Sequence, residues 1–263
     1  VEVEIDWNED FPDHFVAVSP KRNEVPAQVI SKVGNKVTLI FSATIASLSY
    51  QTYEIKASEK TPVSTLKITE SSLENECYIV SLDEKGDITS VYDKILEKEL
   101  RSSPMRLDFL PQAPKEWPAW TIMYKDVMAE AKGYVEGPPE VRVLEQGPVR
   151  VVLEVKRQSF GSLFIQRISL AAGGGGDRLE IDNSIAWKTR ECMLKATFPL
   201  AASNPKATYD IGWGVIERGN NHERLHEVPG QQWADITDSE EKFGVSILND
   251  CKYGWDKPDD QTL

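Results

Sequence analysis

The fold of this chain is decided by its central stretch, which reads Val149-Arg150-Val151-Val152-Leu153-Glu154-Val155-Lys156. Side chains of a β-strand point to opposite faces in turn, so apolar residues at every second position line one face. Here the odd-numbered positions are all apolar, and the even-numbered ones are charged except Val152. The stretch therefore predicts a strand with one face on a core and one in water, which is typical of antiparallel sheets.

The same alternation recurs to either side of this stretch. Leu179 and Ile181 alternate with charged residues, and residues 194–200 alternate Leu, Ala, Phe and Leu with Lys195 and Thr197. Asp83-Glu84-Lys85-Gly86 separates two strand-like runs, which predicts a hairpin with Gly86 at a positive φ. Few segments of the sequence favour a helix. Residues 124–132 could form two helical turns, and residues 91–100 could form a strand followed by one helical turn. We predict an all-β, antiparallel sandwich.

A break in composition near residues 57–72 indicates a domain boundary. Polar and turn-forming residues flank a short apolar run there. We expect a small β domain over residues 1–70 and a large β domain over residues 71–263.

Composition excludes several classes of protein. The chain has 263 residues, 40% of them hydrophobic and 27% charged, which is typical of a soluble globular protein. Its formal net charge of −12 argues against a nucleic-acid partner, which needs clustered Lys and Arg. No window approaches the roughly 18 apolar residues of a membrane-spanning helix, so we expect no membrane partner.

Three widely spaced cysteines, Cys77, Cys192 and Cys251, match neither a disulfide framework nor a zinc-ligand spacing. We expect small, buried residues in a reducing compartment, and hence a cytoplasmic location. The chain starts at Val1 without a signal peptide and ends at Leu263, where a strand-like run begins. We therefore expect it to be a piece of a longer protein.

One motif suggests a metal site, because His222-Glu223-Arg224-Leu225-His226 matches the H-E-x-x-H pattern of zinc proteases. That chemistry needs a helix, which places both imidazoles on one face. Gly219 precedes the motif and Pro229-Gly230 follows it, which leaves too few residues for a stable helix. We predict that this motif forms a surface loop, with no metal ligand and no catalytic residue among its side chains.

Other candidate sites have ordinary explanations. Gly173 to Gly176 lacks the ending of a phosphate-binding loop, so a flexible hairpin tip is the better interpretation. Paired carboxylates, which glycoside hydrolysis usually needs, occur at Asp235 with Asp238 and at Asp250 with Asp256. We interpret both pairs as solvated turn residues. The sequence shows no nucleophile elbow and no activated cysteine.

Aromatic residues give the strongest hint of a ligand. Trp117 and Trp120 lie in the Pro-rich run Ala113-Pro114-Lys115-Glu116-Trp117-Pro118-Ala119-Trp120. Proline keeps this run out of regular ladders, so the indoles either pack on a sheet or line a cleft. Exposed indole faces stack well on the C–H groups of sugars.

A series of motifs resembles the C-terminal β region of family 38 glycoside hydrolases, the α-mannosidases. In chain order these are the hairpin at residues 76–94, the P-x-x-W-x-A-W run at 114–120, the strand Leu194-Lys195-Ala196-Thr197-Phe198-Pro199-Leu200, and the blocks 207–218, 232–235 and 244–254. Residues 25–29 and 50–53 resemble turns of the same family. The resemblance spans nearly the whole chain.

The resemblance implies a small β domain that leads into a super-sandwich like that of galactose mutarotase. It also implies retaining hydrolysis of α-mannosides, with the Asp nucleophile and the zinc ligands in an N-terminal barrel whose motifs this chain lacks. The expected partners are that catalytic barrel, a helical bundle of the same polypeptide and the α-mannoside substrate. The resemblance therefore implies no catalytic residue, no metal ligand and no cofactor in this chain itself.

The expected role is non-catalytic: to pack on the barrel and help shape the sugar cleft. Candidate sugar contacts are Trp117, Trp120 and Tyr124, although Pro118 and Thr121 stand where the family usually has Asp. Two alternatives remain open: an autonomous carbohydrate-binding β-sandwich, and a mutarotase-like enzyme acting alone.

Overall fold

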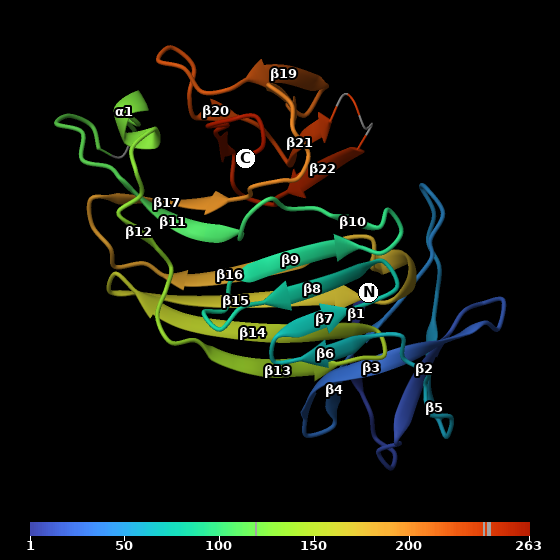
Figure 1. The fold of residues 1–263 in the computed structure, drawn as a ribbon. Coiled ribbons are helices and arrows are strands. Elements are labelled where there is room, and N and C mark those ends of the chain that lie inside the picture. Colours follow the sequence, from blue (N-terminus) through green and yellow to red (C-terminus); the bar gives the residue numbers. More distant parts are fainter. Residues whose placement is uncertain (119, 239, 241–242) are drawn as a thin grey trace. The chain divides into compact units, whose positions relative to one another are not determined.

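The structure is a computed structural model that describes residues 1–118, 120–238, 240 and 243–263. It is almost entirely β (Figure 1), and the strand pairs recorded for the described residues are antiparallel. This confirms the predicted fold class.

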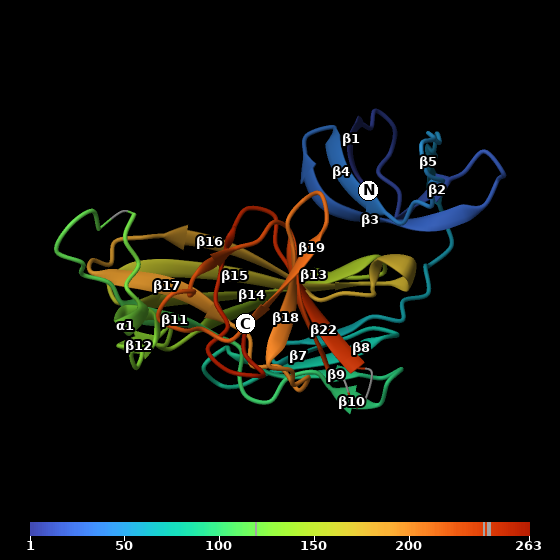
Figure 2. The same ribbon diagram turned by 90° about the horizontal axis from the view of Figure 1, so that it is seen from above.

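The N-terminal strands form a sheet of order β1-β4-β3-β2-β5 with its own core. Its strands are β1 (Glu2–Asp6), β2 (His14–Val18), β3 (Glu24–Val33), β4 (Lys36–Phe41) and β5 (Glu54–Ser58). Figure 2 shows β3 as a strongly curved ribbon along this sheet. The core beneath it consists of Phe15, Ala17, Ala27, Val37, Leu39 and Phe41. Residues 25–29, expected as a turn, instead lie within β3.

The later strands form further sheets, of order β10-β9-β8-β7-β6, β12-β11-β17, β13-β14-β15-β16, β19-β18-β21-β22 and β20-β23. The first of these contains β6 (Lys67–Thr69), β7 (Ser72–Glu74), β8 (Tyr78–Leu82), β9 (Ile88–Asp93) and β10 (Lys98–Glu99). Next along the chain are β11 (Arg106–Pro111), α1 (Tyr124–Val127), β12 (Gly133–Tyr134), β13 (Glu140–Gln146), β14 (Arg150–Ser159), β15 (Ser162–Ala171) and β16 (Glu180–Ala186). The last are β17 (Cys192–Thr197), β18 (Lys206–Asp210), β19 (Val215–Gly219), β20 (Val228–Pro229), β21 (Trp233–Asp238), β22 (Phe243–Leu248) and β23 (Gly254–Trp255).

The chain divides into two compact units. The first comprises residues 1–79, 140–156 and 165–184, and the second comprises 80–139, 157–164 and 185–263. In the second unit a core of Leu107, Phe109, Val135 and Phe164 lies under β11, and another under β18 and β21 includes Tyr209 and Ile236. The candidate site described below belongs to the second unit.

A buried amide ties the first unit together. The side-chain oxygen of Gln28 on β3 accepts hydrogen bonds from the backbone N–H groups of Val149 and Arg150, both at 2.9 Å, and its Nε2 donates to Glu145. Gln28 is only 6% exposed. Because an unpaired buried N–H is costly, this side chain fixes the start of β14 against the N-terminal sheet.

Both hairpins expected from turn residues occur. Gly86 has a φ of 80° between β8 and β9, and the Asp83 carboxylate accepts from the backbone N–H groups of Lys85 and Asp87. The glycine run forms a 3-10 turn (Gly173–Gly175) that connects β15 and β16. Asn75 donates to the carbonyl of Gly176, so a side chain tethers this expected hairpin tip.

The helical expectations were too long. Residues 124–132 form only the single turn α1, which ends at Val127, its one buried residue. A helix this short depends on packing, and the residues after Val127 add no further buried position up to Lys132. Residues 94–97 form a turn between β9 and β10, because the Asp93 carboxylate accepts from two backbone N–H groups there.

The expectation that the cysteines are buried was also wrong in part. Cys251 is exposed, and Cys77 and Cys192 are half-buried. No helix in the described ranges is long and apolar enough to cross a membrane.

The alternation predicted that the polar face of β14 lies in water, but Glu154 on that face is buried. Glu154 is 3% exposed and lies between two arginines: its Oε1 accepts from Arg142 on β13, and its Oε2 accepts from Arg167 at 3.1 Å on β15. These long side chains cover the carboxylate while their own charged ends reach solvent. The hydrogen bond from Arg142 holds the pKa of Glu154 below its usual 4.5 against the opposing effect of burial, and Arg167 adds to it.

Replacing Glu154 by Gln should reduce stability most at neutral pH. A carboxylate whose pKa is depressed by folding stabilises the fold above its unfolded pKa, and this contribution is lost as the pH falls through the folded value. We expect Glu154→Gln to cost about 1–2 kcal/mol near neutral pH and progressively less below pH 4.5. Urea unfolding at a series of pH values would measure this difference.

The control is Glu140→Gln on the neighbouring strand, which removes an exposed partner of Lys156 and should cost less than about 0.5 kcal/mol. A Glu154→Gln cost that is independent of pH would contradict the assignment, because it would arise from packing and not from charge.

Candidate functional site

The connection between β11 and β12 carries the three predicted sugar contacts, and we call residues 114–128 the aromatic segment. Its backbone turns at Trp117, whose φ is 52°, and the Trp117 carbonyl accepts from the N–H groups of Trp120 and Thr121, both at 2.9 Å. The indoles of Trp117 and Trp120 stack in parallel, with ring centroids 5.7 Å apart. They are 65% and 82% exposed, so the outer faces are open to a ligand. Ala119, part of the expected motif, lies outside the described residues.

Tyr124 begins α1 and has a different neighbour. Its ring lies 5.3 Å from that of His226, whose Nε2 is 3.2 Å from the carbonyl oxygen of Ile122. A carbonyl only accepts, so Nε2 carries the proton and donates it. The recorded contacts thus bring Trp117 and Trp120 together, and they place Tyr124 against a histidine from the H-E-x-x-H motif.

That motif forms a turn and not a helix, as the flanking residues predicted. His222 and Leu225 form an isolated antiparallel bridge through two backbone hydrogen bonds, of 3.0 and 2.9 Å. The Nδ1 of His222 accepts from the backbone N–H of Arg224. The geometry that a zinc protease requires is therefore not formed by these two histidines. Among the residues that the structure describes, no group of three or more His, Cys, Asp and Glu side chains is placed to hold a metal.

An ion cluster lies next to this turn. The Nζ of Lys195 on β17 contacts the carboxylates of Glu227 and Asp256, the latter at 3.0 Å, and these three side chains are only 13–17% exposed. The alternation in 194–200 predicted a solvated Lys195, and Asp256 was expected in a solvated turn. Both expectations were wrong because the segments around β20 and β23 cover this part of β17. Asp235 and Asp238 lie on β21, where Asp235 accepts from Thr237 and Ser246.

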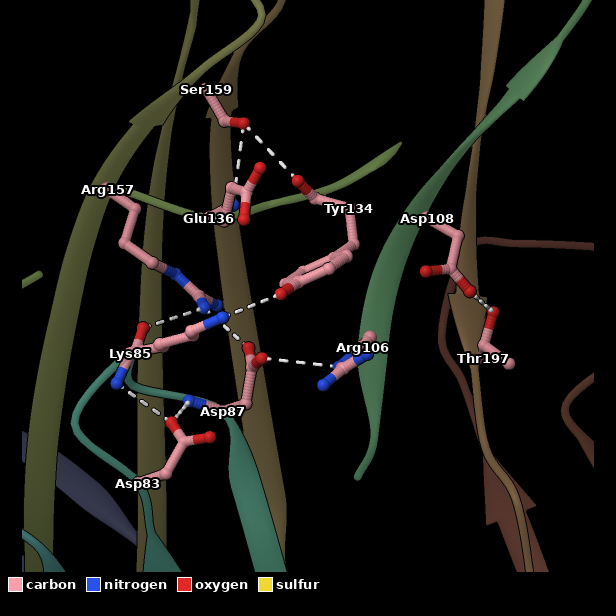
Figure 3. Close-up of polar contacts among 10 residues, drawn as sticks. All are labelled: Asp83, Lys85, Asp87, Arg106, Asp108, Tyr134, Glu136, Arg157, Ser159 and Thr197. Carbon is pink, nitrogen blue, oxygen red and sulfur yellow. Dashed lines mark hydrogen bonds and ion pairs between the residues drawn. The ribbon is translucent and has the colours of Figure 1, made fainter. Parts of the chain in front are cut away.

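A second ion cluster surrounds Asp87, the residue immediately before β9 (Figure 3). Its Oδ1 accepts from the Nη1 of Arg157 at 2.6 Å, and its Oδ2 is 3.4 Å from the Nε of Arg106. The side chains of Asp87 and Arg157 are each 2% exposed. Burial raises the pKa of Asp87, and the bond from Arg157 opposes that rise.

Tyr134 joins the Asp87 cluster to the surface. The Arg106 guanidinium lies over its ring, 4.2 Å from the centroid, and its hydroxyl accepts from Lys85 at 2.9 Å (Figure 3). These contacts join the β8–β9 hairpin to β11, β12 and the end of β14. The cluster therefore has a structural role: it stabilises the position of β11, the strand that leads into the aromatic segment.

The fold and these clusters define an antiparallel β domain with an exposed aromatic segment. The sequence pattern of the family "Glycosyl hydrolases family 38 C-terminal domain" matches residues 73–263, and the chain belongs to this family. The resemblance inferred from the motifs is therefore confirmed.

Individual relatives agree with this assignment. The chain is 25% identical to alpha-mannosidase G of Dictyostelium discoideum over 94% of its own length, and 28% identical to alpha-mannosidase 2C1 of Mus musculus over 73%. It spans only 24% and 19% of those proteins. An alpha-mannosidase from Enterococcus faecalis V583 matches all of this chain with 37% of its own, at a TM-score of 0.73 and 14% identity, which shows a shared fold.

Proposed function

We propose that this chain is the non-catalytic C-terminal β portion of an α-mannosidase, which packs on the catalytic domain and helps to shape the mannoside cleft. The family match supports the proposal, because relatives named as α-mannosidases are about four to five times longer than the stretch they share with this chain. Retaining hydrolysis, with an Asp nucleophile and a zinc ion in an N-terminal barrel, is part of the proposal. The residues of this chain take no step in that chemistry.

The observation that carries the proposal is an exposed apolar surface at one end of the β18–β21–β22 strands. Ile211, Trp213, Leu248 and Tyr253 form this apolar end, and Trp213 is fully exposed. Backbone hydrogen bonds join the segments that carry them: Gln231 to Asp210, Asn249 to Gln232, and Gly230 to Tyr253. Clustered apolar side chains on a surface mark a site of association. The proposed occupants are the catalytic barrel and the helical bundle of the same polypeptide.

Three finer parts of the proposal stay predictions. Trp117, Trp120 and Tyr124 are the proposed sugar contacts, and the open outer faces of the two indoles support that role. A boundary between a small domain (1–70) and a large one (71–263) is proposed from composition. A cytoplasmic location is proposed from cysteine usage.

Hydrolysis of an aryl α-mannoside with added zinc tests the proposal. We expect activity in a protein that extends upstream through the barrel, and none above the buffer rate in residues 1–263. The control is the longer protein with its barrel Asp nucleophile replaced by Asn, which should be inactive. Turnover by residues 1–263 alone would contradict the proposal, because the catalytic groups would then lie in this chain.

A second candidate function is an autonomous carbohydrate-binding module, which the two exposed, parallel indoles favour. Isothermal titration of residues 1–263 with mannose and mannobiose separates the candidates. Binding that is lost in Trp120→Ala would favour the module, whereas the first proposal expects no measurable binding without the barrel.

A further inference from the structure

The loop that carries the H-E-x-x-H motif is held at both ends. Asn221 binds the segment after β23 at one end, and Glu227 pairs with Lys195 at the other. Next to Asp256, Lys257 donates its backbone N–H to the Oδ1 of Asn221 at 3.0 Å, and Asn221 donates its own N–H to the Lys257 carbonyl at 2.7 Å. The Nδ2 of Asn221 also donates to Asp256. At the other end Glu227 reaches Lys195, which holds both carboxylates. Residues 221–227 are thus held between β17 and the segment after β23.

The backbone around Glu227 is built for this contact. Glu227 has a φ of 49°, in the left-handed region that is unfavourable for a residue with a side chain. Gly254 on β23 faces it: a Cβ there would lie 2.4 Å from the Oε1 of Glu227. A larger residue at this position would push the Glu227 carboxylate away from its present place. The placement of one carboxylate therefore depends on an unfavourable φ and a glycine, in addition to the lysine.

The loop held in this way supports the aromatic segment at two points. His226, next to Glu227, donates from Nε2 to the Ile122 carbonyl and packs against the Tyr124 ring. At the far end of α1, the Nδ2 of Asn221 lies 3.6 Å from the sulfur of Met128. Both supports are side chains of the same fastened loop.

We propose that Lys195, Glu227 and Asp256 are positioning residues: they fix His226 so that its ring and its Nε2–H hold Tyr124 and the aromatic segment in place for the sugar. This inference rests on the proposed function, which puts the aromatic segment at the mannoside cleft. The three charged groups act through His226 and touch no substrate. A buried lysine between two carboxylates is costly to desolvate, and fixing one geometry is the role that such a cluster can supply.

Glu227→Gln is the test, because it keeps the shape of the side chain and removes its charge. Glu217→Gln is the matched control: Glu217 also pairs with a lysine, Lys206, but at an exposed position on β19 in the same unit. The first readout is NMR of residues 1–263 without sugar. We expect Glu227→Gln to shift the ring signals of His226 and Tyr124 and to weaken the Nε2–H tautomer signature of His226. Glu217→Gln should leave all of these unchanged.

The second readout is steady-state kinetics in the longer, active protein. Misplaced binding groups weaken substrate binding more than the chemical step, so we expect Glu227→Gln to raise KM roughly tenfold with a smaller change in kcat. His226→Phe breaks the same link and leaves the ion cluster intact, so it should raise KM similarly. Lys195→Arg, which keeps the charge, should retain most of the binding.

The outcomes separate the two proposals. Unchanged His226 and Tyr124 signals in Glu227→Gln would overturn the positioning role, and so would an unchanged KM in His226→Phe when Trp120→Ala raises KM. If Glu227→Gln shifts the NMR signals but Trp117→Ala and Trp120→Ala leave KM unchanged, the sugar contact fails and the support of Tyr124 by the ion cluster stands.

Discussion

Replacing Arg157 by Met is expected to lower the free energy of unfolding by about 3–5 kcal/mol, because it leaves the Asp87 carboxylate buried without its main counter-charge. Arg157 donates to Asp87 at 2.6 Å and to the Lys85 carbonyl at 3.1 Å from the same nitrogen. Arg106 remains near Asp87 at 3.4 Å, but it is partly exposed and also engaged with Tyr134. Urea unfolding of the variant and the parent chain would measure the loss.

The pH dependence of this loss identifies its cause. Burial already raises the pKa of Asp87, and removing Arg157 takes away the main opposing influence, so the folded-state pKa should rise further. A carboxyl group whose pKa is raised by folding destabilises the fold at any pH above its folded-state pKa. This cost falls as the pH is lowered towards 3.8, the pKa of the carboxyl group in the unfolded chain. The cost of Arg157→Met should therefore shrink on acidification.

A double variant provides the control. Asp87→Leu with Arg157→Met removes both charges and should recover much of the stability lost in Arg157→Met, because an apolar pair needs no desolvation of charge. A double variant as unstable as the single one, or a cost that does not change with pH, would show that Arg157 acts through packing of its aliphatic chain.

The sequence contained a signal for Arg157 that the strand prediction left unused. Arg157 follows Val151, Leu153 and Val155 at the same parity, so the alternation that predicted β14 also places this arginine on the core side. A charged residue at a core position calls for a buried partner. The local sequence pattern could not identify that partner, since Asp87 lies in a hairpin 70 residues earlier.

Lys195 is a residue for which the alternation predicted the wrong exposure. Its alternation with Leu194 and Ala196 predicted that Lys195 is solvated, and β17 overlaps the predicted run 194–200 over residues 194–197. What covers Lys195 is a carboxylate on each of two distant loops, and neither loop has a period that relates it to β17. Period-two patterns therefore predicted strands reliably, but they could not tell a solvated polar face from one covered by loops.

The composition of the sequence predicted the aromatic segment but not the geometry of that segment. Proline spacing predicted that Trp117 and Trp120 stay outside the ladders, which is correct. Their parallel stack depends on a positive φ at a tryptophan, for which no residue preference gives warning. The link from Tyr124 to His226 joins two motifs that the sequence offers separately.

Phe109→Ala should cost about 3–5 kcal/mol, as expected for a large aromatic side chain removed from a packed core. Phe109 on β11 is fully buried, and its ring lies 4.3 Å from that of Phe160 and 5.9 Å from those of Phe164 and Trp187. A cavity at this place would have rings on three sides that cannot close it without leaving their own contacts. Thermal and urea unfolding of the variant would measure the loss.

Phe160→Ala is the matched control, because it removes the other ring of the stacked pair at a position that is 45% exposed. We expect it to cost about 1 kcal/mol, mainly the aromatic contact itself. Phe109→Leu, which keeps most of the buried volume, should lose about half as much as Phe109→Ala. Equal losses in Phe109→Ala and Phe160→Ala would mean that the stacked pair, and not burial under β11, holds this core together.

Loss of the Phe109 ring should also affect the surface, because β11 ends at Pro111, three residues before the aromatic segment begins. A core that loosens under β11 should also release the Trp117–Trp120 stack, which indole fluorescence of Phe109→Ala under native conditions would detect.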